Sequence, residues 1–246
     1  METKKSFDTN SNVYTIIYAS VLVIIVALML AFTSSALKSK QLTNVELDRK
    51  KQILSSIAVS TDGQDASALY DKYITESVIT DINAKILSTD KGKTFAVNVA
   101  EESAKKDVST RLLPVYIATV DVAKKYIFPV RGAGLWGAIW GYVALNDDKN
   151  TVFGVYYSHA SETPGLGADI VEDKFKSQFP GKKIFNAANK FVSIAVMKAG
   201  QKAIDQDQVD AIAGGTITSK GLETMLLNSI GQYEKYLTTN SEEVQE

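Results

Sequence analysis

The stretch Pro114–Ser158 reads PVYIATVDVAKKYIFPVRGAGLWGAIWGYVALNDDKNTVFGVYYS, and it decides the fold class. It contains runs rich in β-branched and aromatic residues, namely PVYIATVDV, KKYIFPV, GAIWGYVAL and NTVFGVYYS, with Gly, Asn or Asp at most of the junctions. Short apolar runs bounded by such turn residues are typical of strands joined by hairpins. We therefore predict a twisted, mainly antiparallel sheet.

Two helical patterns precede these strands, and another strand-like run, TFAVNV, lies at 94–99. The first pattern has apolar residues at Leu42, Val45, Ile53, Leu54 and Ile57, and the second at Leu69, Tyr73, Val78, Ile82 and Ile86. Apolar residues at helical spacing are typical of an amphipathic helix. We expect these helices to form a stalk and a first docking layer.

Beyond the strands, the chain is predicted to return to short helices. We expect one helix over Asp169–Phe179, ended by the turn Phe179–Lys182, and a strand over Phe191–Met197. The last helix is expected to start near Ser219, a good N-cap residue, with apolar residues along one face. Helices packed against an antiparallel sheet make this an α+β domain.

The segment Tyr14–Phe32 is almost wholly apolar, and no charged residue lies between Asp8 and Lys38. Its length matches the roughly 20 helical residues that cross a hydrocarbon core about 30 Å thick. The alternative is a cleaved signal peptide, because Ser34-Ser35-Ala36 is similar to a cleavage site, but signal cores usually span only about 7–15 residues. We expect a retained, single-pass anchor. Lysines flank the segment on both sides, so local charge leaves its orientation open.

The length of 246 residues and the apolar share of 45% allow one or two domains with a buried core. The patterns above predict an N-terminal tail at 1–12, a transmembrane helix at 13–34, a helical stalk at 35–90, the α+β domain at 91–239 and a solvated tail at 240–246.

The composition excludes several kinds of site. The chain has no cysteine and one histidine, so disulfides, thiolate nucleophiles, Cys-ligated metals and histidine pairs that chelate a metal are impossible. We expect no metal site and no catalytic residue, and any redox chemistry needs a bound organic cofactor. Lys and Arg number 27 against 28 Asp and Glu, so the chain lacks the strongly basic surface that binds nucleic acid.

The segment Gly132–Gly137 satisfies G-x-G-x-x-G, the dinucleotide-binding fingerprint. That fingerprint requires a helix immediately afterwards, because the pyrophosphate binds at the helix N-terminus. Here a strand pattern, AIWGYVAL, follows instead. We therefore reject a nucleotide-binding Rossmann unit.

The loop His159–Ala168 contains a proline, two glycines and several small polar residues. Its glycines would let backbone N–H groups approach a flat ligand, but a tight turn between strand and helix explains the same residues. His159 could relay protons, although a lone histidine at a strand end is more often a hydrogen-bonded structural residue. Glu162 could titrate near a cofactor, although a surface carboxylate is the commoner outcome.

The segment Asp210–Ser219 lies directly before the last helix and carries Gly214 and Gly215. Exposed glycine N–H groups and the positive end of a helix together favour a phosphate site. It is not a P-loop, because no Gly-Lys-Ser/Thr follows at the required spacing. An ordinary capped helix after a loop is the alternative that the residues leave open.

Both loops resemble those of the FMN-binding domain shared by the C subunit of Na+-translocating NADH:quinone oxidoreductases and the G subunit of Rnf complexes. The family pattern D-x-x-(S/T)-G-A-T, whose last threonine receives flavin mononucleotide (FMN), lies on Asp210–Thr216 with departures at Ala213 and Gly215. The pattern E-T-P-G-L-G is matched in full by Glu162–Gly167. The run Gly-Leu-Trp-Gly at 134–137 looks like the C subunit of the oxidoreductases rather than the G subunit of Rnf complexes. Together with the membrane helix, the resemblance covers essentially the whole chain.

The resemblance implies one FMN per chain, joined through its 5′-phosphate as a phosphoester on Thr216. It implies that the cofactor is bound by Glu162, Thr163, Gly165, Leu166, Gly167, Lys198, Gly214 and Gly215. For Lys198, a solvated surface position is the open alternative. A Mg2+-dependent FMN transferase would recognise the chain through Asp210, Gly214 and Thr216.

The resemblance also implies an electron-transfer subunit of a respiratory Na+ translocase, without independent catalytic activity. It would lie in the bacterial inner membrane with its soluble domain on the periplasmic side, and relay single electrons between an iron centre and the FMN of a neighbouring subunit. The implied partners are the membrane B, D and E subunits, the A subunit and the NADH- and FAD-binding F subunit. The Na+ path is expected elsewhere, because Tyr14–Phe32 contains no ionisable carboxylate or amine.

Two alternatives stay open from the residues. One is an Rnf-type G subunit that serves ferredoxin. The other is a flavin-free scaffold module, which the departures at Ala213 and Gly215 motivate.

Overall fold

The structure is a computed structural model that describes residue 9 and residues 11–239. It divides into two compact units, Met1–Asp48 and Arg49–Glu246. The expected tail at 240–246 lies outside the described residues, as do 1–8 and 10 of the expected N-terminal tail.

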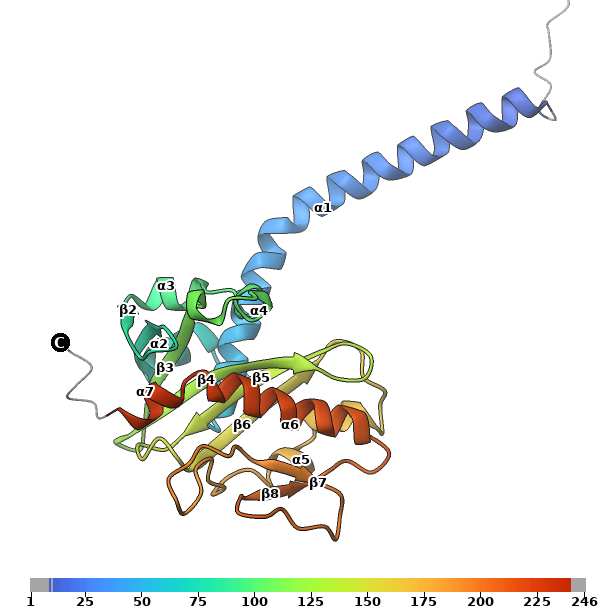
Figure 1. Cartoon of the computed structure of the whole chain (residues 1–246). Coiled ribbons are helices and arrows are strands. Elements are labelled where there is room, and N and C mark those ends of the chain that lie inside the picture. The colour runs from blue at the N-terminus through green and yellow to red at the C-terminus, as the bar shows by residue number, and fades with distance from the viewer. Residues whose placement is uncertain (1–8, 10, 240–246) are drawn as a thin grey trace, which may run out of the picture. The chain divides into compact units, whose positions relative to one another are not determined.

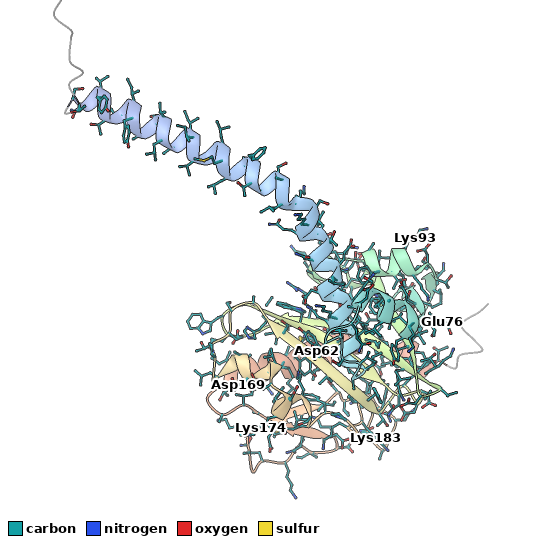
Figure 2. All side chains as sticks on the ribbon, turned by 180° about the vertical axis from the view of Figure 1, so that it is seen from behind. Asp62, Glu76, Lys93, Asp169, Lys174 and Lys183 are labelled. Carbon is teal, nitrogen blue, oxygen red and sulfur yellow. The ribbon has the colours of Figure 1, made fainter. Side chains whose placement is uncertain are left out.

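The described part of the first unit is dominated by one helix. Helix α1 begins at Asn12 and continues to Ser56, and by length and composition it could cross a membrane. No residue of its most apolar 18-residue window is buried, and its side chains project outward on all sides (Figure 2). The rings of Tyr14 and Tyr18 stack, with 6.2 Å between their centroids. The apolar segment is therefore helical and exposed, as a membrane span requires.

A six-stranded antiparallel sheet forms the centre of the second unit (Figure 1). In sheet order, its strands are β2 (Ile86–Ser88), β1 (Ile74–Thr80), β3 (Leu113–Val120), β4 (Ala123–Ala133), β5 (Ala138–Leu145) and β6 (Val152–His159). The strands predicted within Pro114–Ser158 are β3 to β6, and each pairs with the next along the chain. The predicted antiparallel sheet and the α+β class are confirmed.

Tight turns set the register between these strands. Asp121 and Val122 join β3 to β4 with φ of 49° and 68°, the geometry of a two-residue hairpin turn whose twist matches that of the strands. The loop Gly134–Gly137 joins β4 to β5 and is closed by a hydrogen bond of 2.8 Å from the Gly134 N–H to the Gly137 carbonyl. The G-x-G-x-x-G segment therefore forms a hairpin, which confirms that it is not a dinucleotide-binding turn.

Different helices cover the two faces of the sheet. On β4, Phe128 belongs to one apolar core and Ile127 to the other, because alternate side chains of a strand point to opposite faces. The first core includes residues of the helices α5, α6 and α7 (Asp173–Lys176, Thr216–Gly231 and Glu234–Thr238). The second core contains Ile53 and Leu54 from the end of α1, both fully buried, and Tyr70 of α2 (Ala66–Tyr73).

The strand predicted at 94–99 is wrong. The chain there is divided between the helices α3 (Lys91–Ala96) and α4 (Val99–Ala104). The side chains of Asp90 and Asn98 cap the N-termini of these helices by accepting backbone N–H groups. Two N-cap residues that lie eight positions apart favour two short helices, and they override the alternation of apolar and polar residues that predicts a strand. A short 3-10 turn, η1 (Val108–Thr110), follows before β3.

The second predicted helical pattern holds only as far as Tyr73. Helix α2 ends there, and β1 begins at Ile74 and pairs with β3. Val78 therefore lies in a strand of the central sheet, so pairing with a neighbouring strand overrides the local helical spacing. The segment expected as a helical stalk at 35–90 includes both β1 and β2.

The segments after β6 are shorter than predicted. The helix expected over Asp169–Phe179 is replaced by the 3-10 helix η2 (Gly167–Val171) and by α5. Of the strand expected over Phe191–Met197, only β7 (Ala195–Met197) forms, and it pairs in parallel with β8 (Gln208–Asp210).

The last long helix starts earlier than predicted. Helix α6 begins at Thr216, and Ser219 lies inside it and is buried. The hydroxyl of Ser219 accepts the N–H of Ile212 at 3.1 Å, so it fixes the preceding loop and does not cap the helix.

Candidate functional site

Thr216 is the first residue of α6, and its side chain is exposed. Gly214 has φ of 74°, a left-handed conformation that glycine adopts without a side-chain clash. Gly215 is the N-cap residue and is buried. The two glycines thus turn the chain from β8 into α6 and leave the hydroxyl of Thr216 accessible.

The start of α6 is suited to an anion. The first four N–H groups of an α-helix have no acceptor within the helix, and here the first return bond runs from the Ser219 N–H to the Gly215 carbonyl at 2.9 Å. No side chain of the described residues caps this end, because the N-cap residue is glycine. Uncapped N–H groups and the helix dipole both favour a phosphate beside Thr216.

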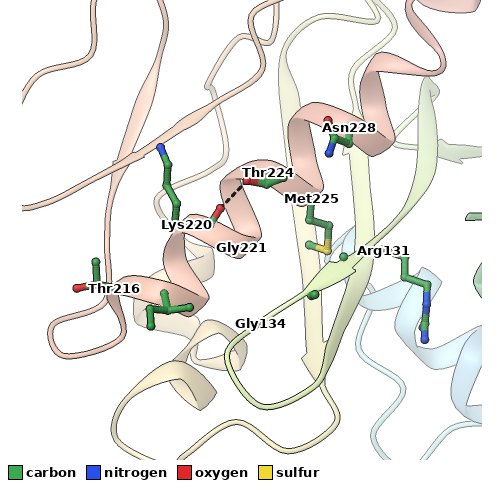
Figure 3. A pocket seen from close by; sticks show the side chains of 11 residues that line it. Arg131, Gly134, Thr216, Lys220, Gly221, Thr224, Met225 and Asn228 are labelled. Carbon is green, nitrogen blue, oxygen red and sulfur yellow. Dashed lines mark hydrogen bonds between the residues drawn. The ribbon is translucent and has the colours of Figure 1, made fainter. Parts of the chain in front are cut away.

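A cavity of about 640 Å³ opens beside Thr216, between α6 and the end of β4 (Figure 3). It is lined by Arg131, Gly132, Ala133, Gly134, Thr216, Ile217, Lys220, Gly221, Thr224, Met225 and Asn228. Its volume falls in the range of about 300–1,000 Å³ that is typical of small-molecule sites. The lining follows α6 from Thr216 to Asn228, a rise of roughly 18 Å at 1.5 Å per residue.

One face of α6 gives this cavity a polar wall. Thr216, Lys220, Thr224 and Asn228 follow one another at intervals of four residues, so they lie on the same side of the helix. The hydroxyl of Thr224 donates to the Lys220 carbonyl at 2.9 Å, and the Lys220 amine is hydrogen-bonded to Glu223. Lys220 and Arg131 also line the cavity, but the Lys220 amine is paired with Glu223 and Arg131 lies beside Ser229, far along α6 from Thr216.

Glycines let α6 pack closely on β4. A Cβ added to Gly132 would lie 2.7 Å from the Cβ of Met225, and one added to Gly221 would overlap the carbonyl oxygen of Ala133. Side chains at either position would push the helix off the strand. The close approach fixes the cavity wall against the sheet.

Glu162 is buried, with 5% of its surface exposed, so the expectation of a surface carboxylate is wrong. Its Oε1 accepts the N–H of Trp136 at 2.8 Å, and its Oε2 accepts the hydroxyl of Thr218 at 2.5 Å. Gly134 and Gly167 lie against the carboxylate, since a Cβ on either residue would overlap it. The carboxylate therefore joins the β4–β5 hairpin, the loop after β6 and the first turn of α6.

The pKa of Glu162 is lowered. Burial acts to raise it, but hydrogen bonds from the Thr218 hydroxyl and from the N–H groups of Trp136, Gly137 and Leu135 together outweigh burial. A carboxylate that accepts several N–H groups is stabilised in its charged form. Glu162 is therefore ionised at neutral pH.

His159 lies at the end of β6, and its ring Nδ1 accepts the N–H of Glu162 at 3.1 Å. This contact supports the structural interpretation of His159, because it fixes the backbone that carries Glu162.

The loop Glu162–Gly167 is a compact turn. The carbonyl of Thr163 accepts the N–H groups of Leu166 and Ala168, each at 3.1 Å, and Gly165 has φ of 75°. The side chain of Leu166 is 41% exposed and lies against Gly214, where an added Cβ would be 2.6 Å from its Cδ2. The two loops that the sequence singles out are thus in contact.

Not every predicted residue lines the cavity. Among the predicted cofactor and recognition residues, only Thr216 lines the cavity. Three others are buried, namely Glu162, Gly167 and Gly215. Four lie exposed on the adjoining loops, namely Thr163, Gly165, Leu166 and Gly214. Lys198 and Asp210 are exposed at the ends of β7 and β8, where Asp210 pairs with Met197. Asp210 and Lys198 are therefore near one another along the parallel ladder.

The sequence interpretation missed Thr218, Lys220 and Arg131. Thr218 lies within the motif segment Asp210–Ser219, but its role depends on the buried carboxylate of Glu162, which lies 56 positions away in the sequence. The four-residue spacing of Thr216, Lys220 and Thr224 is visible in the sequence, yet such a polar row is typical of a solvated helix face. These side chains line a cavity only because the end of β4 lies opposite them.

The described residues contain no cluster of three or more His, Asp or Glu side chains placed to hold a metal ion. The donors near Thr216 are the uncapped N–H groups of α6 and hydroxyls, which suit a phosphate, and the adjoining cavity has room for an organic ligand.

Comparison with known proteins identifies relatives of this chain. The family described as "FMN-binding domain" matches residues 134–231, which include the 134–137 hairpin, the 162–167 loop and Thr216. The chain is 31% identical over 240 residues to the C subunit of the Na(+)-translocating NADH-quinone reductase of Pseudomonas aeruginosa, with 89% of this chain and 91% of that protein covered. It is 28% identical over 230 residues to the C subunit of Haemophilus ducreyi, with 88% and 89% covered.

Solved structures give the same result. The chain is similar to the crystal structure of the Na(+)-translocating NADH-quinone reductase C subunit from Parabacteroides distasonis, with a TM-score of 0.75, 42% identity, and 83% of this chain and 98% of that chain covered. NqrC of Shewanella oneidensis shares the fold at a TM-score of 0.65 and 22% identity, with 78% and 95% covered. This chain therefore belongs to the NqrC family, the C subunits of Na+-translocating NADH-quinone reductases, and contains their FMN-binding domain.

Proposed function

We propose that the chain carries one FMN as a phosphoester on the hydroxyl of Thr216 and relays single electrons within a Na+-translocating NADH:quinone reductase. The observation that carries this proposal is the position of Thr216. Its hydroxyl is exposed at an uncapped helix N-terminus, beside glycines and at the mouth of a cavity of about 640 Å³.

The residues around Thr216 fit FMN. The uncapped N–H groups of α6 favour the negative charge of a phosphodiester. Gly214 and Gly215 bring backbone close to the attachment point without side chains in the way. The exposed side chain of Leu166, packed on Gly214, offers an apolar surface for a flat ring.

The protein's contribution to electron transfer is to hold and orient the cofactor. FMN supplies reversible one-electron chemistry when it is bound. In this proposal, the 162–167 loop, including Thr163, Gly165 and Gly167, positions the ring, and Lys198 approaches it from the end of β7. Asp210 and Gly214 are the residues that the Mg2+-dependent FMN transferase reads together with Thr216.

The proposed setting is the bacterial inner membrane, with α1 as a single-pass anchor and the soluble domain on the periplasmic side. The relatives are named as subunits of an NADH-quinone reductase, which supports electron exchange with neighbouring subunits. The proposed partners are the membrane B, D and E subunits, the A subunit and the F subunit. Electrons would pass between an iron centre and the FMN of a neighbour.

The test is the intact mass of the full-length chain co-expressed with an FMN transferase. We expect one FMN phosphodiester increment and a fluorescent band in a denaturing gel, and both should disappear in Thr216→Ala. Thr224→Ala is the matched control, because Thr224 is an exposed threonine of the same helix and lines the same cavity. Wild-type protein without the increment, or labelling that persists in Thr216→Ala, would overturn the proposal.

A further inference from the structure

Three segments far apart in the sequence meet at one carboxylate. Glu162 accepts the N–H of Trp136 from the β4–β5 hairpin at 2.8 Å and the hydroxyl of Thr218 from α6 at 2.5 Å. Gly134 and Gly167 enclose the same group, and neither has room for a side chain. The position of this charge is therefore fixed by packing and by hydrogen bonds.

The carboxylate lies close to the proposed attachment point. Gly167, which touches it, also lies behind Gly215, where an added Cβ would be 3.4 Å from the Gly167 nitrogen. Gly215 directly precedes Thr216. Gly167 thus contacts both the carboxylate of Glu162 and the residue that precedes the acceptor.

Within the part of the chain that the structure describes, no cation pairs with the carboxylate of Glu162. The ion pairs there are those of Glu76, Glu102, Asp173 and Glu223 with lysines, whereas Glu162 is held by N–H and hydroxyl donors. The nearby ring of His159 accepts the backbone N–H of Glu162 through Nδ1 and is not among the partners of the carboxylate. A buried charge without a counterion acts over a longer distance than an exposed one, since water does not screen it.

We infer that Glu162 tunes the bound flavin: its fixed negative charge disfavours the negative charge that an electron brings to the ring, and so holds the reduction potential low. This inference rests on the flavin site proposed above and adds the residue that sets its electrostatics. Charge near the ring is one of the means by which proteins adjust a flavin. Glu162 acts through space and through the position it gives Thr218, so it is a positioning and tuning residue.

Glu162→Gln is the decisive variant because it removes the charge and keeps the shape. The amide oxygen can still accept the Trp136 N–H, and the Thr218 hydroxyl can rotate to accept from the amide NH2. We expect full-length Glu162→Gln, co-expressed with the FMN transferase, to retain its covalent flavin. In a redox titration followed by flavin absorbance, its potential should be more positive than that of the wild type.

The expected size is roughly a tenfold rise in the ratio of reduced to oxidised flavin at a fixed ambient potential. Tenfold corresponds to about 59 mV for a one-electron step. Asp173→Asn is the matched control, because it removes an exposed carboxylate at the surface of the same domain. Its potential should equal that of the wild type.

The outcomes separate this inference from the proposed flavin site. Wild-type protein without covalent FMN would overturn the proposed flavin site. Flavinylated Glu162→Gln with an unchanged reduction potential would overturn only the role of Glu162. Should Glu162→Gln fail to fold, Glu162→Asp decides, because it keeps the charge and is expected to keep the wild-type potential. A markedly more positive potential in Glu162→Asp would show that packing, not charge, is responsible, and would overturn the inference.

Discussion

The side-chain amine of Lys149 donates a hydrogen bond of 3.0 Å to the backbone carbonyl of Thr239, the residue that follows helix α7. Lys149 is buried, and its amine also lies over the rings of Tyr126 and Tyr236, at 5.4 and 5.1 Å from their centroids. The amine thus holds the C-terminal end of α7 against the sheet.

Lys149→Met is expected to lower the free energy of unfolding by about 1–3 kcal/mol, because it keeps the apolar stem but removes the charged hydrogen bond and the contacts with the rings. The measurement is urea unfolding followed by circular dichroism. Lys198→Met is the control for loss of an exposed lysine and should change stability little. Equal stability of Lys149→Met and wild type would contradict the proposed clamp.

Buried tyrosines make a matched pair for a hydrogen-bond test. The hydroxyl of Tyr233 donates to the Pro114 carbonyl at 3.0 Å, whereas the buried hydroxyl of Tyr157 has no hydrogen-bond partner among the described residues. Tyr233→Phe should therefore cost about 1 kcal/mol of stability, and Tyr157→Phe should be neutral or stabilising. Chemical denaturation at pH 7 measures both, and a larger loss for Tyr157→Phe would show that its hydroxyl has a partner in solution.

The same tyrosines predict a loss of stability in alkali. Burial raises the pKa of Tyr116, Tyr157 and Tyr233 in the folded protein, while the unfolded chain ionises near the ordinary value of 10.0. The folded state therefore holds more protons above pH 10, and stability falls as the pH rises. Tyr157→Phe should make this fall less steep, as unfolding measured between pH 9 and about 12 would show. An unchanged slope would place Tyr157 in contact with water.

Glu162 predicts the opposite dependence in acid. Its pKa is lowered in the folded state relative to the ordinary value of 4.5, so its stabilising contribution is present above that value and is lost as the pH falls through the folded pKa. Glu162→Gln should be less stable than the wild type by about 1–2 kcal/mol at pH 7, and the difference should vanish in acid. Thermal unfolding of both proteins between pH 7 and about 3 tests this; a difference that persists in acid would point to lost packing instead.

Gly221→Ala tests the contact between α6 and β4. The added methyl would overlap the carbonyl oxygen of Ala133, which is backbone and cannot turn aside. We expect a loss of about 1–3 kcal/mol even though alanine favours helices. Thr224→Ala on the same helix should be close to neutral, and a stable Gly221→Ala would mean that α6 can move away from the sheet.

Ala213→Ser tests the departure of this chain from the family pattern. The substitution restores a hydroxyl on the exposed loop two residues after Ala211, and it should raise the initial rate of flavin labelling by the transferase severalfold. In-gel fluorescence against time measures the rate. A rate equal to that of the wild type would show that the hydroxyl at this position is dispensable.

Much of the sheet could be predicted from the sequence, because its strands carry their own signals. The runs that became β3 to β6 are apolar, β-branched and bounded by turn residues, and neighbours in sequence are neighbours in the sheet. The failures lie where local and tertiary signals conflict. Val78 has helical spacing but pairs with Val115 across the sheet, and the run at 94–99 alternates like a strand but follows the cap residue Asp90.

The site could be predicted only in part. Thr216 and the 162–167 loop came from their motifs, because those residues stand together in the sequence. The burial of Glu162 could not be foreseen, since it depends on Trp136 and Thr218, which reach it from other elements. A hydrogen-bond network of this kind has no sequence signature, and a carboxylate in a polar loop is ordinarily solvated.

The continuity of α1 has a practical consequence for anyone who cuts the chain. The last two turns of this helix, with Ile53 and Leu54 fully buried, are as much part of the globular interior as any strand. Proteolysis between the apolar segment and Asp48 would release a soluble fragment that keeps its interior sealed. Cleavage a few residues later, beyond Ile53 and Leu54, would remove both side chains and expose the sheet face that they cover. A secreted version of this domain therefore has to start upstream of Arg49.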